Sequence, residues 1–380
     1  MPQFADASEF VAIAAGWNPD PTLSNSLRAE AYTSRKWLKV DFEEIVSSSW
    51  QWVCHAEKLR QPGSFVTTSI ANHPVLVVRD LSGELRAFYN VCKHRAHELM
   101  SGEGQTSRIV CPYHAWTYDL TGQLRRAPHT RSLADFDLSD ICLTPVAVEE
   151  FCSFVFVNLD LSAESLREQS ETLADEVSHW APDLDQLTFS RRLTYEISSN
   201  WKNVVDNFLE CYHCPVAHKD FCTLVDMDTY RVETHGIWSS HMAEAGKSAN
   251  SAYSVEDASV RDHAVWWLWP NTCMMRYPGR GNFIIMHIIP VDVDRTFETY
   301  DFFFETSEPV AGELEAIQYI DKVLQAEDIA LVESVQRGMS TPAFEQGRIV
   351  HDPSGSGKSE HAVHHFHGLV LEAYRRRAGS

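Results

Sequence analysis

Two short segments of the sequence each place one cysteine and one histidine close together. Cys92 and His94 form the first pair, Cys111 and His114 form the second, and sixteen residues separate the two pairs. Two thiolates and two imidazoles suit either a zinc ion or an iron–sulfur cluster in which two histidines replace two cysteines on one iron. Structural zinc sites usually place like ligands together, whereas each pair here is mixed. The mixed pairs therefore favour the iron–sulfur cluster.

With its flanking residues, this motif resembles the Rieske [2Fe–2S] domain. The first loop reads NVCKHR from residue 90, and the second reads CPYHAW from residue 111. The resemblance implies four cluster ligands, namely Cys92, His94, Cys111 and His114. Because two neutral imidazoles replace thiolates, the potential of such a cluster lies at about −150 to +300 mV, against about −400 mV for plant-type ferredoxins. We therefore expect it to accept electrons from a ferredoxin-like donor and to pass them on.

A second group of candidate metal ligands lies in the segment NWKNVVDNFLECYHCPVAH at 200–218. His213 and His218 are five residues apart, so on one continuous helix they would point about 140° away from each other. Pro215 disfavours helix at Cys214, so we expect the helix to end there and His218 to fold back toward His213. Two imidazoles, one carboxylate and open positions form the facial triad of non-haem Fe(II) oxygenases. Two histidines without a shared metal are the alternative.

The whole chain resembles the catalytic subunit of the Rieske non-haem iron oxygenases, whose mononuclear iron motif is D/E-x2-H-x4-H. The resemblance implies a third iron ligand on a late helix, for which Asp328 is the candidate and Glu327 and Glu333 are the alternatives. It also implies that Glu210 bridges a Rieske histidine of one subunit to an iron histidine of the next. A homotrimer with electron transfer between subunits is therefore expected.

Glu210 stands where most ring-hydroxylating members have aspartate, and its context DNFLECYHC is similar to the subgroup acting on carnitine and related betaines. The similarity continues in AFYNVC at 87–92, VESVQRG at 332–338, QGRI at 346–349 and SEH at 359–361. It implies a Rieske cluster and mononuclear Fe(II) as cofactors, with O2 as co-substrate. The chain has no G-x-G-x-x-G fingerprint, so NAD(P)H is expected to act only through a separate reductase with a flavin and a ferredoxin-type centre.

Aromatic residues near the expected iron site are candidates for a substrate pocket. An aromatic face attracts a quaternary ammonium by about 0.5–2 kcal/mol per well-placed ring. The candidates are Tyr212, Trp266, Trp267, Trp269, Tyr277 and Phe283. The alternative for each of them is ordinary sheet core, because aromatic residues favour strands. Arg276 or Arg280 is a candidate partner for a substrate carboxylate.

These features predict the terminal oxygenase of a multicomponent system. Glu210 is expected to convey an electron to iron held by His213, His218 and Asp328, and hydroxylation of an N-methyl group then releases formaldehyde. Two alternatives are a carnitine or γ-butyrobetaine monooxygenase that releases trimethylamine and an aromatic ring-hydroxylating dioxygenase. A non-enzymatic alternative is a Rieske electron-transfer protein, which needs no second metal.

The 380 residues are enough for two domains, each with its own core. We expect an α+β fold with an all-β Rieske domain at 46–161 and a catalytic domain at 162–380, on which residues 1–45 pack. The catalytic domain should contain an antiparallel sheet flanked by helices, an arrangement of helix-grip type. The expected helices lie at 162–181, 201–212 and 313–339, and the expected strands at 193–197, 264–269, 283–290 and 296–304.

The charge and the remaining motifs limit the partners. A net charge of −21 argues against nucleic acid and anionic lipid, and it is compatible with a small cationic or zwitterionic substrate. No signal peptide and no membrane-spanning run is evident, so a cytoplasmic protein is expected. The cysteines outside the cluster, including Cys211 and Cys214, are expected to be reduced thiols. We interpret SGSGKS at 354–359 and the four histidines at 361–367 as loop and packing residues.

Overall fold

The computed structural model describes residues 7–246 and 258–378. The chain divides into two compact units. One unit comprises Met1–Ile45 together with Ser170–Ser380, and the other comprises Val46–Gln169. The second boundary lies eight residues beyond the one expected at 161. None of the helices in the described residues is long and apolar enough to cross a bilayer.

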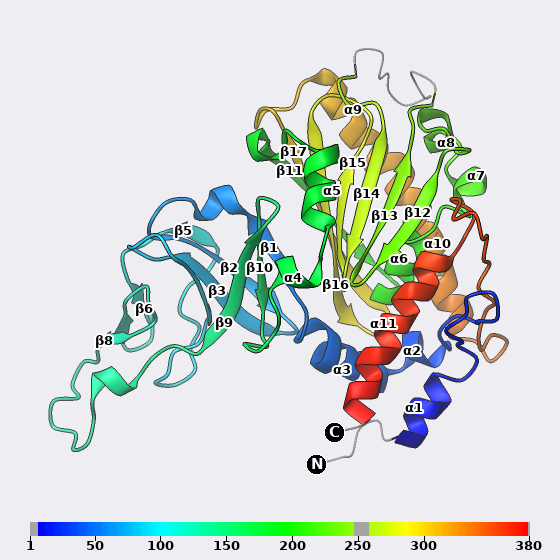
Figure 1. The fold of residues 1–380 in the computed structure, drawn as a ribbon. Helices are drawn as coiled ribbons and strands as arrows, with labels where there is room; N and C mark the ends of the chain where they lie inside the picture. Colours follow the sequence, from blue (N-terminus) through cyan, green and yellow to red (C-terminus); the bar gives the residue numbers. More distant parts are fainter. Residues whose placement is uncertain (1–6, 247–257, 379–380) are drawn as a thin grey trace. The chain divides into compact units, whose positions relative to one another are not determined.

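The unit Val46–Gln169 is built on antiparallel strands, as expected for this region (Figure 1). Its larger sheet has the order β1-β10-β9-β4-β3-β2-β5, and a small sheet has the order β6-β7-β8. The strands are β1 (Gln51–His55), β2 (Ser64–Ile70), β3 (His73–Arg79), β4 (Leu85–Tyr89), β5 (Glu103–Gln105), β6 (Ile109–Val110), β7 (Thr117–Tyr118), β8 (Leu124–Arg126), β9 (Pro145–Phe151) and β10 (Phe154–Asn158). Short helical turns are η2 (Ala56–Leu59), η3 (Leu138–Asp140) and α4 (Leu166–Gln169).

The larger unit contains the antiparallel sheet that the sequence predicts. Among the described residues its order is β11-β17-β16-β15-β14-β13-β12. The strands are β11 (Thr188–Ile197), β12 (Arg231–His235), β13 (Trp238–Ala243), β14 (His263–Leu268), β15 (Thr272–Arg276), β16 (Asn282–Asp292) and β17 (Arg295–Phe304). The expected strands correspond to β11, β14, β16 and β17, whereas β12, β13 and β15 were not predicted.

Helices pack on this sheet, and α6, α10 and α11 lie on one face of it (Figure 1). The described helices of the unit are α1 (Ala7–Ile13), α2 (Glu30–Thr33), α3 (Arg35–Val40), η1 (Asp41–Val46, ending in the other unit), α5 (Leu173–Trp180), η4 (Leu184–Gln186), α6 (Trp201–Phe208), α7 (Cys214–Ala217), α8 (Phe221–Leu224), α9 (Ala311–Tyr319), η5 (Ile320–Leu324), α10 (Gln325–Met339) and α11 (His361–Ala378). With the sheet they give the α+β architecture expected from the sequence.

Three expected helices differ from the observed ones. The helix expected at 162–181 is two short helices, α4 and α5, because Glu171 has a positive φ of 49° that a continuous helix cannot contain. The helix expected at 201–212 ends at Phe208. The helix expected at 313–339 is interrupted by η5, a π-helical turn directly before α10. Such turns are frequent at functional sites.

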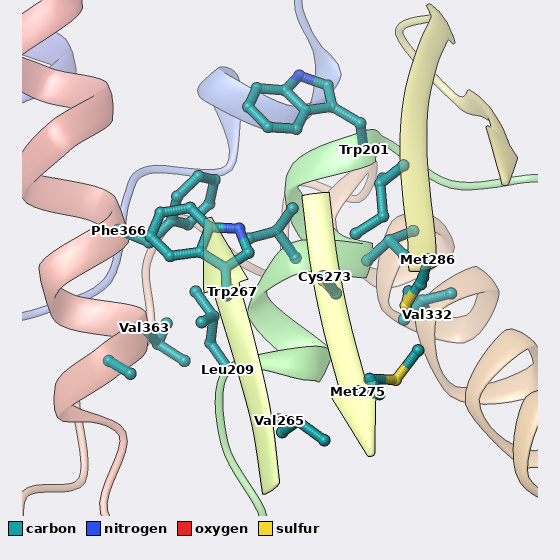
Figure 2. Packing of buried hydrophobic residues seen from close by; sticks show 14 of the residues in the cluster. Trp201, Leu209, Val265, Trp267, Cys273, Met275, Met286, Val332, Val363 and Phe366 are labelled. Atoms are coloured by element: carbon teal, nitrogen blue, oxygen red, sulfur yellow. The ribbon is translucent and has the colours of Figure 1, made fainter. Parts of the chain in front are cut away.

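The core of the larger unit lies between the sheet and its helices. Figure 2 shows Trp267 of β14 against Phe366 of α11, and their ring centroids are 5.5 Å apart. Met275 and Met286 from neighbouring strands belong to the same buried cluster as Val332 of α10. These contacts bury the apolar face of the sheet. Burial of apolar surface is the dominant favourable contribution to the free energy of folding.

A buried ion pair joins three segments of this unit that are distant in the sequence. The ammonium of Lys202 contacts the carboxylate of Asp41, and both side chains are fully buried. Asp41 also accepts hydrogen bonds from Trp201 Nε1 at 3.0 Å and from Tyr374 Oη at 2.6 Å. Burial lowers the pKa of Lys202, and the Asp41 charge opposes that shift. Without Asp41, Lys202 would be an unpaired buried charge.

We expect Asp41→Ala to lower the free energy of unfolding by about 3–5 kcal/mol, because it leaves the Lys202 ammonium without a counter-charge. Urea unfolding followed by tryptophan fluorescence measures this. The control is Glu305→Ala, which breaks the half-exposed pair with Arg280 and should cost about 1 kcal/mol or less. Equal effects of the two variants would contradict the prediction.

Candidate functional site

The two predicted cluster loops share one backbone geometry. In each loop the cysteine carbonyl accepts a hydrogen bond from the residue four positions later, Ala96 or Ala115, and both bonds are 3.0 Å long. Both alanines have a φ of 56°, a left-handed conformation that costs a residue with a Cβ free energy. The cysteine N–H donates to the carbonyl of the residue five positions later, at 2.9 Å in the first loop and 2.8 Å in the second. Two equivalent turns therefore present the two Cys–His pairs.

The four predicted ligands lie together and differ in burial. Cys92 and Cys111 are buried, whereas His94 is exposed and His114 is half-buried. The rings of His94 and His114 are 4.7 Å apart, and Trp116 stacks on His94 at 4.8 Å. The thiols thus lie inside the unit and the imidazoles toward solvent.

The donor set fits a [2Fe–2S] cluster. The Nδ1 atom of His114 is buried without a hydrogen-bond partner among the described residues, as expected of a metal ligand in the absence of its metal. Burial raises the pKa of the Cys111 thiol, and the neighbouring Cys92 raises it further. Bound iron would supply the positive charge that favours the two thiolates. Tyr118 Oη lies 3.3 Å from Cys92 Sγ and can donate a hydrogen bond to it.

The second predicted group of ligands also comes together. His213 Nε2 and His218 Nε2 are 3.1 Å apart, and Asp328 Oδ1 lies 2.9 Å from His218 Nε2 and 3.6 Å from His213 Nε2. Within the described part of the chain, this is the one group of three or more His, Cys, Asp or Glu residues whose ligand atoms all lie within 4.8 Å of one another. Two imidazoles and one carboxylate at these distances fit a facial triad for Fe(II).

Two further carboxylates fix the orientation of the imidazoles. Glu210 Oε1 lies 2.5 Å from His213 Nδ1, and Glu327 Oε2 lies 2.8 Å from His218 Nδ1. A carboxylate only accepts, so each Nδ1 carries the proton and each Nε2 can bind a metal. Glu327 therefore contacts the far side of His218, while Asp328 faces both Nε2 atoms. Glu333, the other alternative ligand, accepts instead from the backbone N–H of Ser198 at 2.9 Å.

The local structure of the histidine segment differs from the expected one. Pro215 does not end a long helix but lies in the first turn of α7, where its missing N–H costs no hydrogen bond. The chain leaves α6 at Leu209, so Glu210 lies between the two helices and accepts from the backbone N–H of His213 at 3.1 Å. His218 follows the last residue of α7. One short helix thus separates the two imidazoles and lets them converge.

The carboxylates of Glu210, Glu327 and Asp328 give this site a negative electrostatic potential. Burial lowers the pKa of His218, but Asp328 and Glu327 outweigh that effect and raise its pKa to about 9. The negative charge of these carboxylates thus favours a cation beside the Nε2 atom of His218. A divalent cation would satisfy the same acceptors.

A disulfide joins Cys211 and Cys214, the residues that flank the Tyr212–His213 pair. The expectation of reduced thiols is thus wrong for these two cysteines. The reason is geometric, because the turn between α6 and α7 brings their Cα atoms to 4.9 Å, within the range that a disulfide spans. The other seven cysteines, all within the described residues, form no disulfide.

A cavity opens from the His213, His218 and Asp328 group between the sheet and helices α6 and α10. Its aromatic lining consists of Phe208, Phe221, Tyr230, Tyr277 and Tyr300. Met275, Met286 and several aliphatic residues complete the apolar wall, and Glu298 adds a buried carboxyl group. None of the described lining residues is lysine or arginine.

Of the six aromatic residues predicted for the pocket, only Tyr277 lines the cavity. Trp266 points to the other face of the sheet, where its Nε1 donates to Glu176 at 2.9 Å and its ring stacks on Phe283. Trp267 and Trp269 pack against Phe366 in the core, and Tyr212 is 51% exposed. Successive residues of a strand point to opposite faces of the sheet, so Trp266 and Phe283 lie on the face away from the cavity.

The two candidate arginines are also occupied elsewhere. Arg276 pairs with Asp183, and Arg280 pairs with Glu305 at 2.8 Å. Neither lines the cavity. The histidines of α11 have structural partners, as interpreted from the sequence: His367 Nε2 lies 2.9 Å from Asp206 Oδ1, and His364 Nε2 lies 2.7 Å from the Asn18 carbonyl.

Tyr300 and Glu298 of β17 also line the cavity and were not predicted from the sequence. The sequence contains a signal for both, because every second residue of this strand from Glu298 onward is aromatic, namely Tyr300, Phe302 and Phe304. A period of two places all four on one face. A glutamate in a row of inward-facing aromatic residues indicates a buried carboxyl group.

Comparison with known families matches both parts of the chain. Residues 49–137 match the Rieske [2Fe-2S] domain, and residues 184–376 match the ring hydroxylating alpha subunit (catalytic domain). The second match covers the candidate iron ligands and β11 to β17.

Individual relatives extend over nearly the whole chain. The carnitine monooxygenase oxygenase subunit of Escherichia coli K12 is 37% identical, and the alignment covers 94% of this chain and 96% of that protein. The chloroplastic choline monooxygenase of Beta vulgaris is 33% identical, with 90% of this chain and 75% of that protein covered. The solved structure of a quaternary ammonium Rieske monooxygenase superposes with a TM-score of 0.87 at 34% identity, covering 93% of this chain and 97% of that one.

We expect Tyr118→Phe to lower the reduction potential of the cluster by about 20–65 mV. The hydroxyl can donate to Cys92 Sγ and stabilises the charge added on reduction, and a net hydrogen bond of about 0.5–1.5 kcal/mol converts to this range for one electron. Redox titration followed by EPR measures the potential. Tyr113→Phe is the control, because Tyr113 is exposed and contacts His114 through its ring rather than its hydroxyl; equal shifts would contradict the prediction.

Asp328→Ala should remove about one iron per chain, because two imidazoles alone do not complete the triad. Iron analysis combined with the visible spectrum checks this, since the cluster absorbance should be retained. Glu333→Ala removes a carboxylate from the same helix and should keep the full iron content. Full iron retention in Asp328→Ala would refute the assignment of this ligand.

Proposed function

Because this chain belongs to the catalytic subunits of the Rieske non-haem iron oxygenases, in the subgroup of quaternary ammonium monooxygenases, we propose that it hydroxylates a betaine-type substrate. The observation that carries this proposal is the convergence of His213, His218 and Asp328 on an aromatic cavity whose described lining contains no lysine or arginine. Such a cavity suits a bulky cation better than an anion, because aromatic faces attract positive charge.

The proposed roles of the residues follow from their positions. His213, His218 and Asp328 would hold one Fe(II), and Cys92, His94, Cys111 and His114 would hold the Rieske cluster. When bound, these groups supply single electrons and activate O2. Glu210 holds the Nδ1 proton of His213 and is the proposed link for electron transfer. Electrons would come from NAD(P)H through a separate reductase with a flavin and a ferredoxin-type centre.

The walls of the cavity would position the substrate and exclude water. Tyr230, Tyr277 and Tyr300 can each offer a ring face to a trimethylammonium group. The carbon that faces the iron ligands then decides the product. Hydroxylation of an N-methyl group gives a hemiaminal, which breaks its C–N bond to give formaldehyde and the demethylated amine. We propose this N-demethylation as the reaction.

A second candidate reaction has support from a relative. The protein of Escherichia coli K12 that is 37% identical is a carnitine monooxygenase oxygenase subunit. Hydroxylation of the chain carbon next to the nitrogen would break the same type of bond and release trimethylamine instead. Both reactions use the same cavity and differ only in the carbon presented to the iron.

We also propose a homotrimer with electron transfer between subunits, in the cytoplasm. The solved quaternary ammonium Rieske monooxygenase is described with inter-subunit electron transfer. The bond between Glu210 and His213 is consistent with such a route, because Glu210 also lines a second hollow with Asp206 and His367.

The substrate assignment is tested by product analysis. Iron-loaded protein receives a reductase, NADH and O2 with glycine betaine, choline, L-carnitine, γ-butyrobetaine or an aromatic acid. We expect formaldehyde from at least one quaternary ammonium compound, whereas trimethylamine would select the second reaction. A cis-diol from the aromatic acid, with no product from any ammonium compound, would overturn the proposal. Asp328→Ala protein is the control for reductase-dependent background.

A further inference from the structure

Glu298 has a buried carboxyl group of which only one oxygen has a hydrogen-bond partner among the described residues. It lies on β17 with a fully buried side chain. Its Oε2 accepts a hydrogen bond from Gln325 Nε2, whereas its Oε1 is buried without a partner among the described residues. Buried charged groups are normally paired, because removing a carboxylate from water is costly. The unsatisfied oxygen therefore indicates a missing partner.

The cavity that contains the candidate iron ligands offers a place for such a partner. Glu298 lines this cavity together with His218 and Asp328. Burial raises the pKa of Glu298 well above its ordinary value, and the negative charge of Asp328 adds to this effect. A lone carboxylate is thus unfavourable there, and a positive charge nearby would remove that cost.

No lysine or arginine of the described cavity wall supplies that positive charge. The cavity wall to which Glu298 belongs instead includes the rings of Tyr300, Tyr277 and Tyr230. A carboxylate beside aromatic faces is complementary to a quaternary ammonium group, which needs charge and ring contacts but offers no N–H for a hydrogen bond.

We propose that Glu298 determines substrate specificity, as the charge partner that selects a quaternary ammonium group over a neutral group of the same shape. This inference rests on the proposed function and adds the residue that recognises the cation. The site then has two acidic parts, Asp328 for the metal and Glu298 for the substrate.

A purely structural role for Glu298 predicts different behaviour. Gln325 donates to Glu298 and accepts from Tyr300 Oη at 2.9 Å, so the carboxyl group also helps to hold the start of α10. The variant Glu298→Gln keeps the size and hydrogen-bonding capacity of the side chain but removes the charge. A structural role would alter the binding of charged and neutral ligands alike.

The test compares ligands that differ only in charge. The probes are choline with its carbon isostere 3,3-dimethylbutan-1-ol, and γ-butyrobetaine with 5,5-dimethylhexanoate. Calorimetry on the anaerobic iron-loaded protein gives the Kd of each. We expect wild type to prefer the ammonium member of a pair, and Glu298→Gln to reduce that preference by about 30-fold or more. Glu298→Asp, which keeps the charge, should retain the preference.

Two controls separate the outcomes. Glu305→Gln removes a carboxylate that lies outside the cavity, in the pair with Arg280, so its preference between the isosteres should equal that of wild type. Iron content and circular dichroism show that each variant is folded. If Glu298→Gln keeps the wild-type preference for the ammonium probe within about two-fold, the role of Glu298 is overturned while the proposed function stands. If the wild-type protein neither binds nor converts any ammonium probe, both the proposed function and the role of Glu298 are overturned.

Discussion

The hydrogen bonds that carboxylates make to the Nδ1 atoms of His213 and His218 are the constraint on which the candidate metal site depends. Glu210 and Glu327 hold the two protons, so both Nε2 atoms are directed at Asp328. Each carboxylate comes from a different part of the chain, one before α7 and one on α10. If either imidazole rotated, its Nε2 would leave the triad. The positions of the three candidate ligands thus depend on five side chains, the ligands themselves and the two glutamates that orient the imidazoles.

The rest of the larger unit serves to bring α6, α7 and α10 to one end of the cavity. The sheet supplies a continuous apolar face, and α6, α10 and α11 cover it. Alternation along the strands decides which side chains reach the cavity and which reach the opposite face. Val265 and Met275 line the cavity, whereas Trp266, the residue after Val265 on β14, contacts Glu176 of α5. The direction of each side chain on its strand therefore decides which residues form the cavity wall.

Two buried acidic groups in this unit show how differently the fold treats charge. Asp41 is surrounded by donors from Lys202, Trp201 and Tyr374, so every part of its charge is compensated within the protein. Glu298 has one donor and one unpartnered oxygen. The first arrangement is that of a structural ion pair. The second is that of a site prepared for a ligand, because an unsatisfied buried carboxyl group is costly unless something binds to it.

The sequence by itself determined the family, the two groups of candidate ligands and the α+β class, because metal ligands must occur as particular residue types at short spacing. It also located β11, β14, β16 and β17, whose apolar patterns are strong. It failed for the pocket, where five of six aromatic predictions lie elsewhere, and for the Cys211–Cys214 disulfide. Only the tertiary structure decided that Asp328 rather than Glu327 faces both imidazoles, and that Glu298 is buried beside them. Neighbouring residues on one helix look alike in sequence, and a rotation of about 100° about the helix axis separates the candidate metal ligand from the partner of an imidazole N–H.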